Sequence, residues 1–200
     1  MREFSLPMAL VDFIPVLLFA AAAVLLQRKL YSRMSKGAFA LFAAGTIDII
    51  CAGGLKALYK LLYALSVCDF TPLSQMFFPV QSIGFMLAGL GMIALVTHSQ
   101  GNKTLALAAP PVFSGTFVFV GLMVAGLGMM NAGLSILAAR CRQKKLIIWF
   151  AVSFVCSLCM GYLSSRDFTK ASMNWIAELV NILGQGALLI GAAKLSPEEE

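Results

Sequence analysis

The stretch from Phe42 to Leu55, FAAGTIDIICAGGL, lies at the centre of a long apolar segment and returns in altered form later in the chain. The later stretch, Phe150 to Leu163, reads FAVSFVCSLCMGYL and matches it at Phe, Ala, Cys, Gly and Leu at a constant spacing of 108 residues. Both stretches are dominated by apolar side chains. They predict two related helices that lie in apolar surroundings.

The composition of the whole chain agrees with this prediction. Of its 200 residues, 60% are apolar and 12% charged, and the mean hydropathy is +0.89. Such a balance indicates lipid as the solvent, and a helix needs about 20 apolar residues to cross a bilayer. We therefore predict an all-α integral membrane protein with six transmembrane helices, at Pro7 to Gln27, Gly37 to Leu55, Gln75 to Thr97, Ser114 to Ala139, Leu146 to Tyr162 and Met173 to Ala193.

The third and sixth of these segments also match each other, and the tripeptide Asp-Phe-Thr precedes each of them. Three spans are an odd number, so a second copy that follows directly must cross the membrane in the opposite sense. This predicts a 3+3 inverted-topology repeat, with a first unit at 1–97, a connector at 98–113, a second unit at 114–195 and an acidic tail at 196–200. The matched positions are Gln81 with Asn181, Gly84 with Gly184 and Gly91 with Gly191.

The loop charges suit two opposed copies, because Lys and Arg then divide almost equally between the two faces. The alternative is a seventh helix in TLALAAPPVF, residues 104–113, which would bring both basic loops to one face. Pro110 and Pro111 and the short apolar length argue against it. A second short repeat, AGLGM at Ala88–Met92 and Ala125–Met129, predicts close packing of the third and fourth spans.

The last span carries the sharpest local pattern, MNWIAELVNILGQG, in which four polar residues share one helix face. Against lipid this face would be costly, so we expect it to point into the protein or a wet cavity. The alternative is a structural seam of hydrogen bonds between helices. The four residues are Asn174, Glu178, Asn181 and Gln185.

Other polar residues within the predicted spans extend this hypothesis. Asp48 lies in mid-span among isoleucines, where an ionised carboxylate needs a partner or water, and this makes it a candidate proton or cation acceptor. The alternative is a neutral Asp that hydrogen-bonds a neighbouring helix. Counting along the helices predicts one depth for Asp12, Gln81, Asn131 and Gln185 and another for Glu178. Lys56 and Lys60 are interpreted as cations that reach the membrane interface.

Several classes of protein find no support. His98 is the one histidine, and neither a nucleophile elbow nor a phosphate loop occurs. The C-x-x-C pair Cys156 and Cys159 lies in an apolar helix, where packing is the simpler role. We therefore predict no cofactor, no metal and no enzyme activity. The net charge is +6, but the cations lie in short loops between the apolar spans, so nucleic acid is not an expected partner.

The sequence favours a multi-pass carrier or channel of the cell membrane that moves a small solute or cation, with protons as candidate coupling ions. The lipid bilayer is its expected surrounding, and a homodimer is compatible with the pattern. The alternative is a membrane sensor or partner-binding subunit, and an intramembrane enzyme that uses Asp48 and Glu178 ranks third. The predicted substrate- or ion-binding residues are Asp48, Glu178, Asn181, Gln185, Asn174, Gln81, Asn131 and Asp12.

Overall fold

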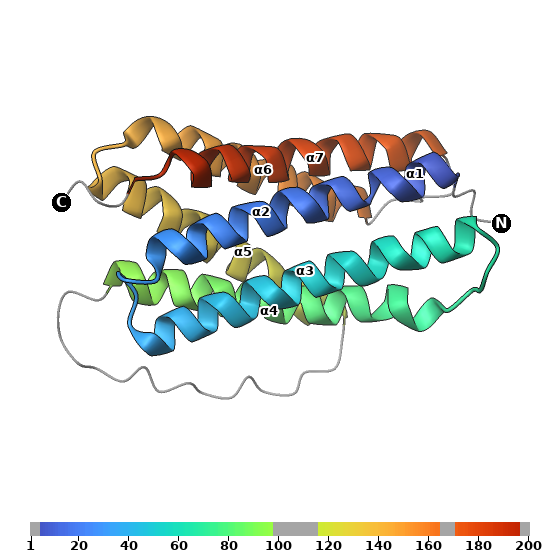
Figure 1. The fold of residues 1–200 in the computed structure, drawn as a ribbon, viewed down its shortest axis with the longest axis horizontal. Helices are drawn as coiled ribbons and strands as arrows, with labels where there is room; N and C mark the ends of the chain where they lie inside the picture. The colour runs from blue at the N-terminus through green and yellow to red at the C-terminus, as the bar shows by residue number, and fades with distance from the viewer. Residues whose placement is uncertain (1–4, 98–115, 165–170, 197–200) are drawn as a thin grey trace.

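The computed structural model describes residues 5–97, 116–164 and 171–196, and within these ranges it contains helices and short turns but no β-strand. Figure 1 shows a bundle of long helices. The helices are α1 (Leu6–Val11), α2 (Phe13–Leu30), α3 (Lys36–Ala64), α4 (Thr71–Thr97), α5 (Thr116–Arg140), the short 3-10 helix η1 (Lys144–Leu146), α6 (Ile147–Ser164) and α7 (Ala171–Lys194).

Six helical segments within the described ranges are long and apolar enough to cross a membrane, which confirms the predicted multi-pass membrane class. α1 and α2 together form the first of them, Leu6–Leu30. The second, Lys36–Ala64, continues well beyond the predicted end at Leu55, so Lys56 and Lys60 belong to a helix that is long and apolar enough to span a membrane.

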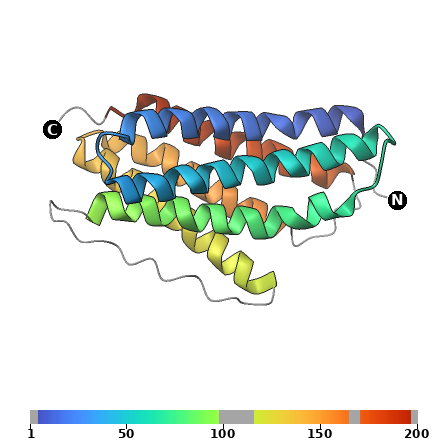
Figure 2. The same cartoon turned by 60° about the horizontal axis from the view of Figure 1, so that its bottom comes forward.

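The long helices pack in chain order and the ring closes on itself. Each helix from α2 to α6 contacts the next one, and α7 returns to contact α2. Figure 2 shows α3 between α2 and α4. Two units of three helices therefore meet at two seams, one between α4 and α5 and the other between α7 and α2.

Contacts between the helices give their relative directions. α2 runs antiparallel to α3, because Gln27 reaches Thr46 while Asp12 reaches Lys60. α3 and α4 are likewise antiparallel, as are α5 with α6 and α6 with α7 (Figure 1). Both seams are parallel. At the α4–α5 seam, Gly89 packs against Gly126, and Gly133 packs against Met92.

The parallel seams correct the prediction of an inverted-topology repeat. Units α2–α4 and α5–α7 start at the same end of the bundle and run in the same sense (Figure 1). The prediction was wrong because it placed Thr97 and Ser114 on one face, which would make α4 and α5 antiparallel, whereas α5 runs in the same direction as α4. The alternative from sequence, a seventh helix between α4 and α5, would make these two helices parallel. The residues that would form this helix belong to 98–115, which lie outside the described ranges.

The helix directions also change the assignment of the charged residues to the two ends of the bundle. We call basic end the end of the bundle where α2, α4, α5 and α7 finish and α3 and α6 start, and far end the opposite one. Among the described residues, every Lys and Arg except Lys56 and Lys60 lies at the basic end. The predicted near-equal division of Lys and Arg between the two faces is therefore not found among the described residues. These basic-end residues are Arg28, Lys29, Arg33, Lys36, Arg140, Arg142, Lys144, Lys145 and Lys194.

The spacings read from the sequence recur as contacts between helices. A side chain at Gly84 would meet Asp48 Cβ at 3.0 Å, and one at Gly184 would meet Cys156 Cβ at 2.8 Å. Asp48 and Cys156 are 108 residues apart and the two glycines 100 apart, which are the two spacings of the sequence match. A second set follows the same rule, with Gly91 against Phe42 and Gly191 against Phe150.

Glycines also allow the α4–α5 seam to close. A Cβ added to Gly126 would collide with the backbone of Phe85 and Met86, so the two helices approach backbone to backbone there. Gly89 and Gly126 belong to the two AGLGM stretches, and their contact confirms the predicted packing of these segments.

The large apolar core occupies the half of the bundle nearer the basic end. Its fully buried side chains include Phe42, Phe150, Leu134 and Leu30, which come from four different helices. The members on α2 all follow Phe19 in the chain and so lie toward the basic end. The other half of the bundle contains the buried charges described next.

Candidate functional site

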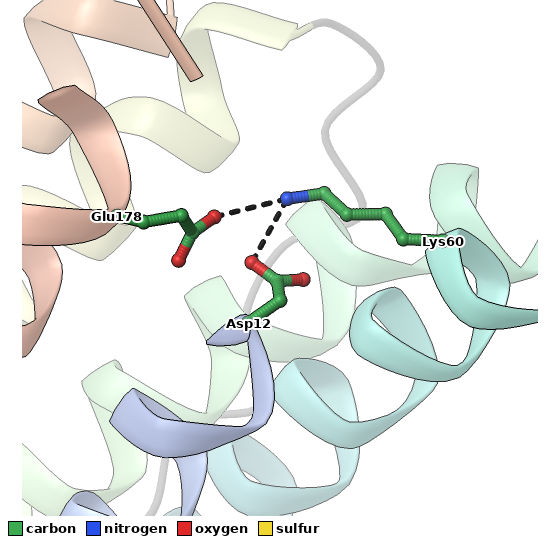
Figure 3. A network of polar contacts seen from close by, with 3 residues as sticks. All are labelled: Asp12, Lys60 and Glu178. Carbon is green, nitrogen blue, oxygen red and sulfur yellow. Dashed lines mark hydrogen bonds and ion pairs between the residues drawn. The ribbon is translucent and has the colours of Figure 1, made fainter. Parts of the chain in front are cut away.

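The first transmembrane segment breaks at Asp12, and proline explains the break. α1 ends at Val11 and α2 begins at Phe13. Pro15 has no N–H group, so the carbonyl of Val11 cannot receive the hydrogen bond that would continue the helix. Asp12 occupies the N-cap position of α2, yet its side chain makes no capping hydrogen bond. It points instead toward α3 (Figure 3).

Lys60 of α3 joins Asp12 to Glu178 of α7 (Figure 3). Its Nζ donates to Asp12 Oδ1 at 2.8 Å and to Glu178 Oε1 at 3.0 Å. The three side chains, which we call the Lys60 cluster, are 9% or less exposed. Charges this deeply buried lose much of their hydration, and the ammonium between two carboxylates compensates for part of that loss.

The cluster corrects two interpretations of the sequence. Lys60 does not extend outward from the helices but is buried within the bundle. Asp12 and Glu178, which were expected at different depths, contact the same Nζ atom. Both lie about 9 to 11 Å from the far end, at 1.5 Å per helical residue, because α1 and α7 both start at that end.

A hydrogen bond secures the end of α3 near the cluster. Tyr59 is buried, and its hydroxyl donates to Asp69 Oδ1 at 3.0 Å. Asp69 belongs to the first Asp-Phe-Thr and lies just before α4, which begins at Thr71. The second copy, Asp167 to Thr169, lies outside the described residues.

A polar cavity lies beside the cluster. It has a volume of about 60 Å³, and Asp12 forms part of its wall. A water molecule needs at least about 10 to 15 Å³ by this measure, so the cavity is large enough to hold water. Its polar lining comes from the break between α1 and α2 and from α3, α4 and α7, namely Asp12, Lys56, Gln81, Asn181 and Gln185.

A second cavity of about 90 Å³ shares much of this wall, including Lys56, Phe77 and Phe85. The two hollows are therefore neighbours. The second one reaches toward α5 and α6, where Met123, Leu127 and Met160 give it an apolar side. Together they lie inside the ring of six helices.

Lys56 provides a second cation in this region. Its Nζ lies 4.3 Å from the centre of the Phe77 ring, a distance suited to cation–π attraction. One helical turn separates Lys56 from Lys60. The four charged groups, Asp12, Glu178, Lys56 and Lys60, have a formal sum of zero when all are ionised.

The amides face the same space from both units. Gln81 of α4 and Asn181 of α7, which lie 100 residues apart in the chain, line both cavities. Gln185 Nε2 reaches Asn181 Oδ1 at 3.5 Å. Gln185 Oε1 and Glu178 Oε2 are buried acceptors without a hydrogen-bond partner among the described residues.

The remaining predicted residues lie apart from the cavity wall. Asn174 is buried one turn before Glu178 on α7. Asn131 is buried on α5, and its Nδ2 donates to the Leu127 carbonyl at 3.0 Å. Asp48 is half-buried against Gly84 of α4 and lines neither cavity.

Sequence reasoning missed Lys56 and Lys60 as site residues. The available signal was their spacing of four, which puts both on one face of a helix that continues to Ala64. Within the described ranges, no group of three His, Cys, Asp or Glu residues is placed to hold a metal ion. Comparison of the chain with protein-family models, curated proteins and solved structures finds no match.

Proposed function

We propose that the protein is a membrane carrier that moves a small polar solute through the cavity beside the Lys60 cluster. The observation that carries this proposal is the buried triad of Asp12, Lys60 and Glu178, whose Asp12 forms part of the wall of a polar cavity inside the helix ring. A bundle that needs only stability gains little from buried ions, because well-packed apolar residues serve as well or better. Ionisable groups within membrane helices instead mark solute and ion pathways.

The arrangement of the two units supports a carrier. Transporters commonly consist of repeated units with the solute site at the interface between them, and units related by an axis along the membrane normal run in the same sense. Here the matched residues Gln81 and Asn181 face one cavity from different units. The broken first helix at Asp12 adds a second feature that carriers share.

The distribution of apolar side chains favours a carrier over an open channel. Phe42, Phe150 and Leu134 are buried between the cavities and the basic end. A solute that reaches the cavity would therefore need a rearrangement of the helices to leave on that side. Alternating access by movement of one unit against the other supplies such a rearrangement.

The charge distribution gives the orientation that we propose. Lys and Arg in short loops accumulate on the cytoplasmic side of membrane proteins. The basic end, which includes Arg33, Arg142 and Lys145, would thus face the cytoplasm of a cell whose plasma membrane holds the protein. The Lys60 cluster and the cavity then lie in the outer half of the membrane.

Flux measurements on proteoliposomes test the proposal. The purified protein is reconstituted and given small carboxylates, amines, neutral polyols and alkali cations in turn, with a pH dye inside the vesicles. One solute class should enter saturably, and Glu178→Gln should lower the rate at least tenfold. The control Ser172→Ala, at an exposed position of the same helix, should leave the rate unchanged.

The absence of flux above protein-free vesicles for every class, with protein that remains folded, would refute the carrier. Recovery of a specific partner from native membranes, lost on Asn181→Leu, would then support the partner-binding alternative.

A further inference from the structure

Lys56 and Lys60 differ in what they bind. Lys60 has a carboxylate on each side. Lys56 forms no hydrogen bond or ion pair with any described residue, and its Nζ lies over the Phe77 ring. An ammonium group carries three N–H donors, and the face of a ring cannot satisfy all of them. Since Lys56 lines both cavities, its unused donors are available to a molecule bound there.

The chemistry of the wall selects an anion. The amides of Gln81 and Asn181 can donate N–H groups to the same ligand that receives a hydrogen bond from Lys56. A cationic ligand would be repelled by Lys56, and Asp12 and Glu178 already share Lys60 as a counterion. Glu178 lines neither cavity, so it offers no second anchor for the ammonium of a zwitterion.

The shape of the space adds a preference for an apolar tail. Beyond Lys56 the second cavity is bounded by Phe78, Met123, Leu127 and Met160. The two volumes of about 60 and 90 Å³ are each well above the roughly 10 to 15 Å³ that one water-sized group needs. A small ligand therefore fits, with its charged group near α3 and its tail toward α5 and α6.

We propose that the cavity binds a small monocarboxylate, with the carboxylate on Lys56 Nζ and the apolar tail between α4, α5 and α6. This inference rests on the proposed carrier function and names its substrate class. It narrows the expectation from sequence, which was a small solute or cation, to an anionic solute.

The charge balance adds a consequence for coupling. The charged groups near the cavity are Asp12 from the break between α1 and α2, Lys56 and Lys60 from α3 and Glu178 from α7, while α4, α5 and α6 contribute no charged side chain to the cavity walls. Their formal sum is zero, so a bound carboxylate leaves one net negative charge. One proton taken from water onto a carboxylate of the cluster restores neutrality. The monocarboxylate and a proton should therefore cross together, one to one.

Binding to the wild-type protein tests the ligand class without any mutation. Butyrate, butyramide, butylamine and 2-aminobutyrate have similar chains but different charges. Calorimetric titration of the purified protein in nanodiscs should show saturable binding of butyrate, at least tenfold tighter than that of the other three. Equal or tighter binding of the amide, the amine or the zwitterion would overturn the proposal.

Substitutions then test the residue. Lys56→Met should weaken butyrate binding at least tenfold, Lys56→Arg should retain binding, and Lys36→Met at an exposed position of the same helix should change nothing. A melting curve for each variant checks that it is folded, and the wild-type ligand series remains decisive if Lys56→Met does not fold. Butyrate affinity unchanged in folded Lys56→Met would overturn the assignment.

The two proposals fail in different ways. Butyrate binding that depends on Lys56, without butyrate flux in proteoliposomes, would support the site and refute the carrier. Flux of another solute class that Lys56→Met leaves unchanged would support the carrier and refute the monocarboxylate.

Discussion

Removal of the Lys60 ammonium should destabilise the protein strongly. In Lys60→Met the carboxylates of Asp12 and Glu178 lose the donor that lies 2.8 Å from one and 3.0 Å from the other. Both carboxylate side chains are 7% or less exposed, so water cannot readily replace that donor. Loss of one partner from a buried ion pair costs about 3 to 5 kcal/mol in free energy of unfolding. For a chain of this size that corresponds to a melting temperature lower by about 6 to 20 °C.

The assay is thermal unfolding of the purified protein in one detergent, followed by circular dichroism. Lys36→Met, which removes an exposed lysine from the same helix, is the matched control and should shift the free energy by no more than about 0.5 kcal/mol. The triple variant Asp12→Asn, Lys60→Met, Glu178→Gln removes all three charges and should recover most of the loss. A melting temperature for Lys60→Met within about 2 °C of wild type would contradict a buried Nζ between two carboxylates.

Three further outcomes follow from the packing and the charges. Gly126→Ala should lower the free energy of unfolding by about 1 to 3 kcal/mol, since its Cβ meets the α4 backbone, whereas Gly54→Ala, which enters open space, should raise it by up to about 1 kcal/mol in the same melts. Lys29→Met should cost about 1 kcal/mol, because Lys29 Nζ donates to three carbonyls at the end of α7. Cys68, exposed at the far end, should react with an impermeant maleimide in intact cells, and labelling of Cys68 only after permeabilisation would reverse the proposed orientation.

The sequence was sufficient for the class of fold and for the local register. Apolar length is a local property, so the six spans could be read directly from the chain. The glycine matches also held, because a helix interface that needs small residues at Gly84 needs them again at Gly184. The direction of the second unit could not be read in this way. That direction depends on whether the chain between α4 and α5 crosses the membrane. Two prolines and a short apolar length in this stretch argued against a crossing.

The candidate site was predictable where helix periodicity alone decides which residues share a face. Glu178, Asn181 and Gln185 form one stripe on α7, and the last two line the cavity. Lys60 was misread because a lysine near the end of a span can turn either toward the interface or inward, and only the neighbouring helices decide between these directions. Asp48 was expected to be a binding residue because it lies in mid-span among apolar residues. That position could not reveal that Asp48 packs against Gly84 of α4.

Lys60 has one further property, which follows from where its two partners originate. Asp12 and Lys60 belong to the first unit, whereas Glu178 belongs to the second. If the units swing apart at the α2–α7 seam, the bond from Lys60 to Glu178 must break while the bond to Asp12 travels with its own unit. The ion pair between Lys60 and Glu178 would thus hold the α2–α7 seam closed. A proton on Glu178 would remove its negative charge and weaken that ion pair.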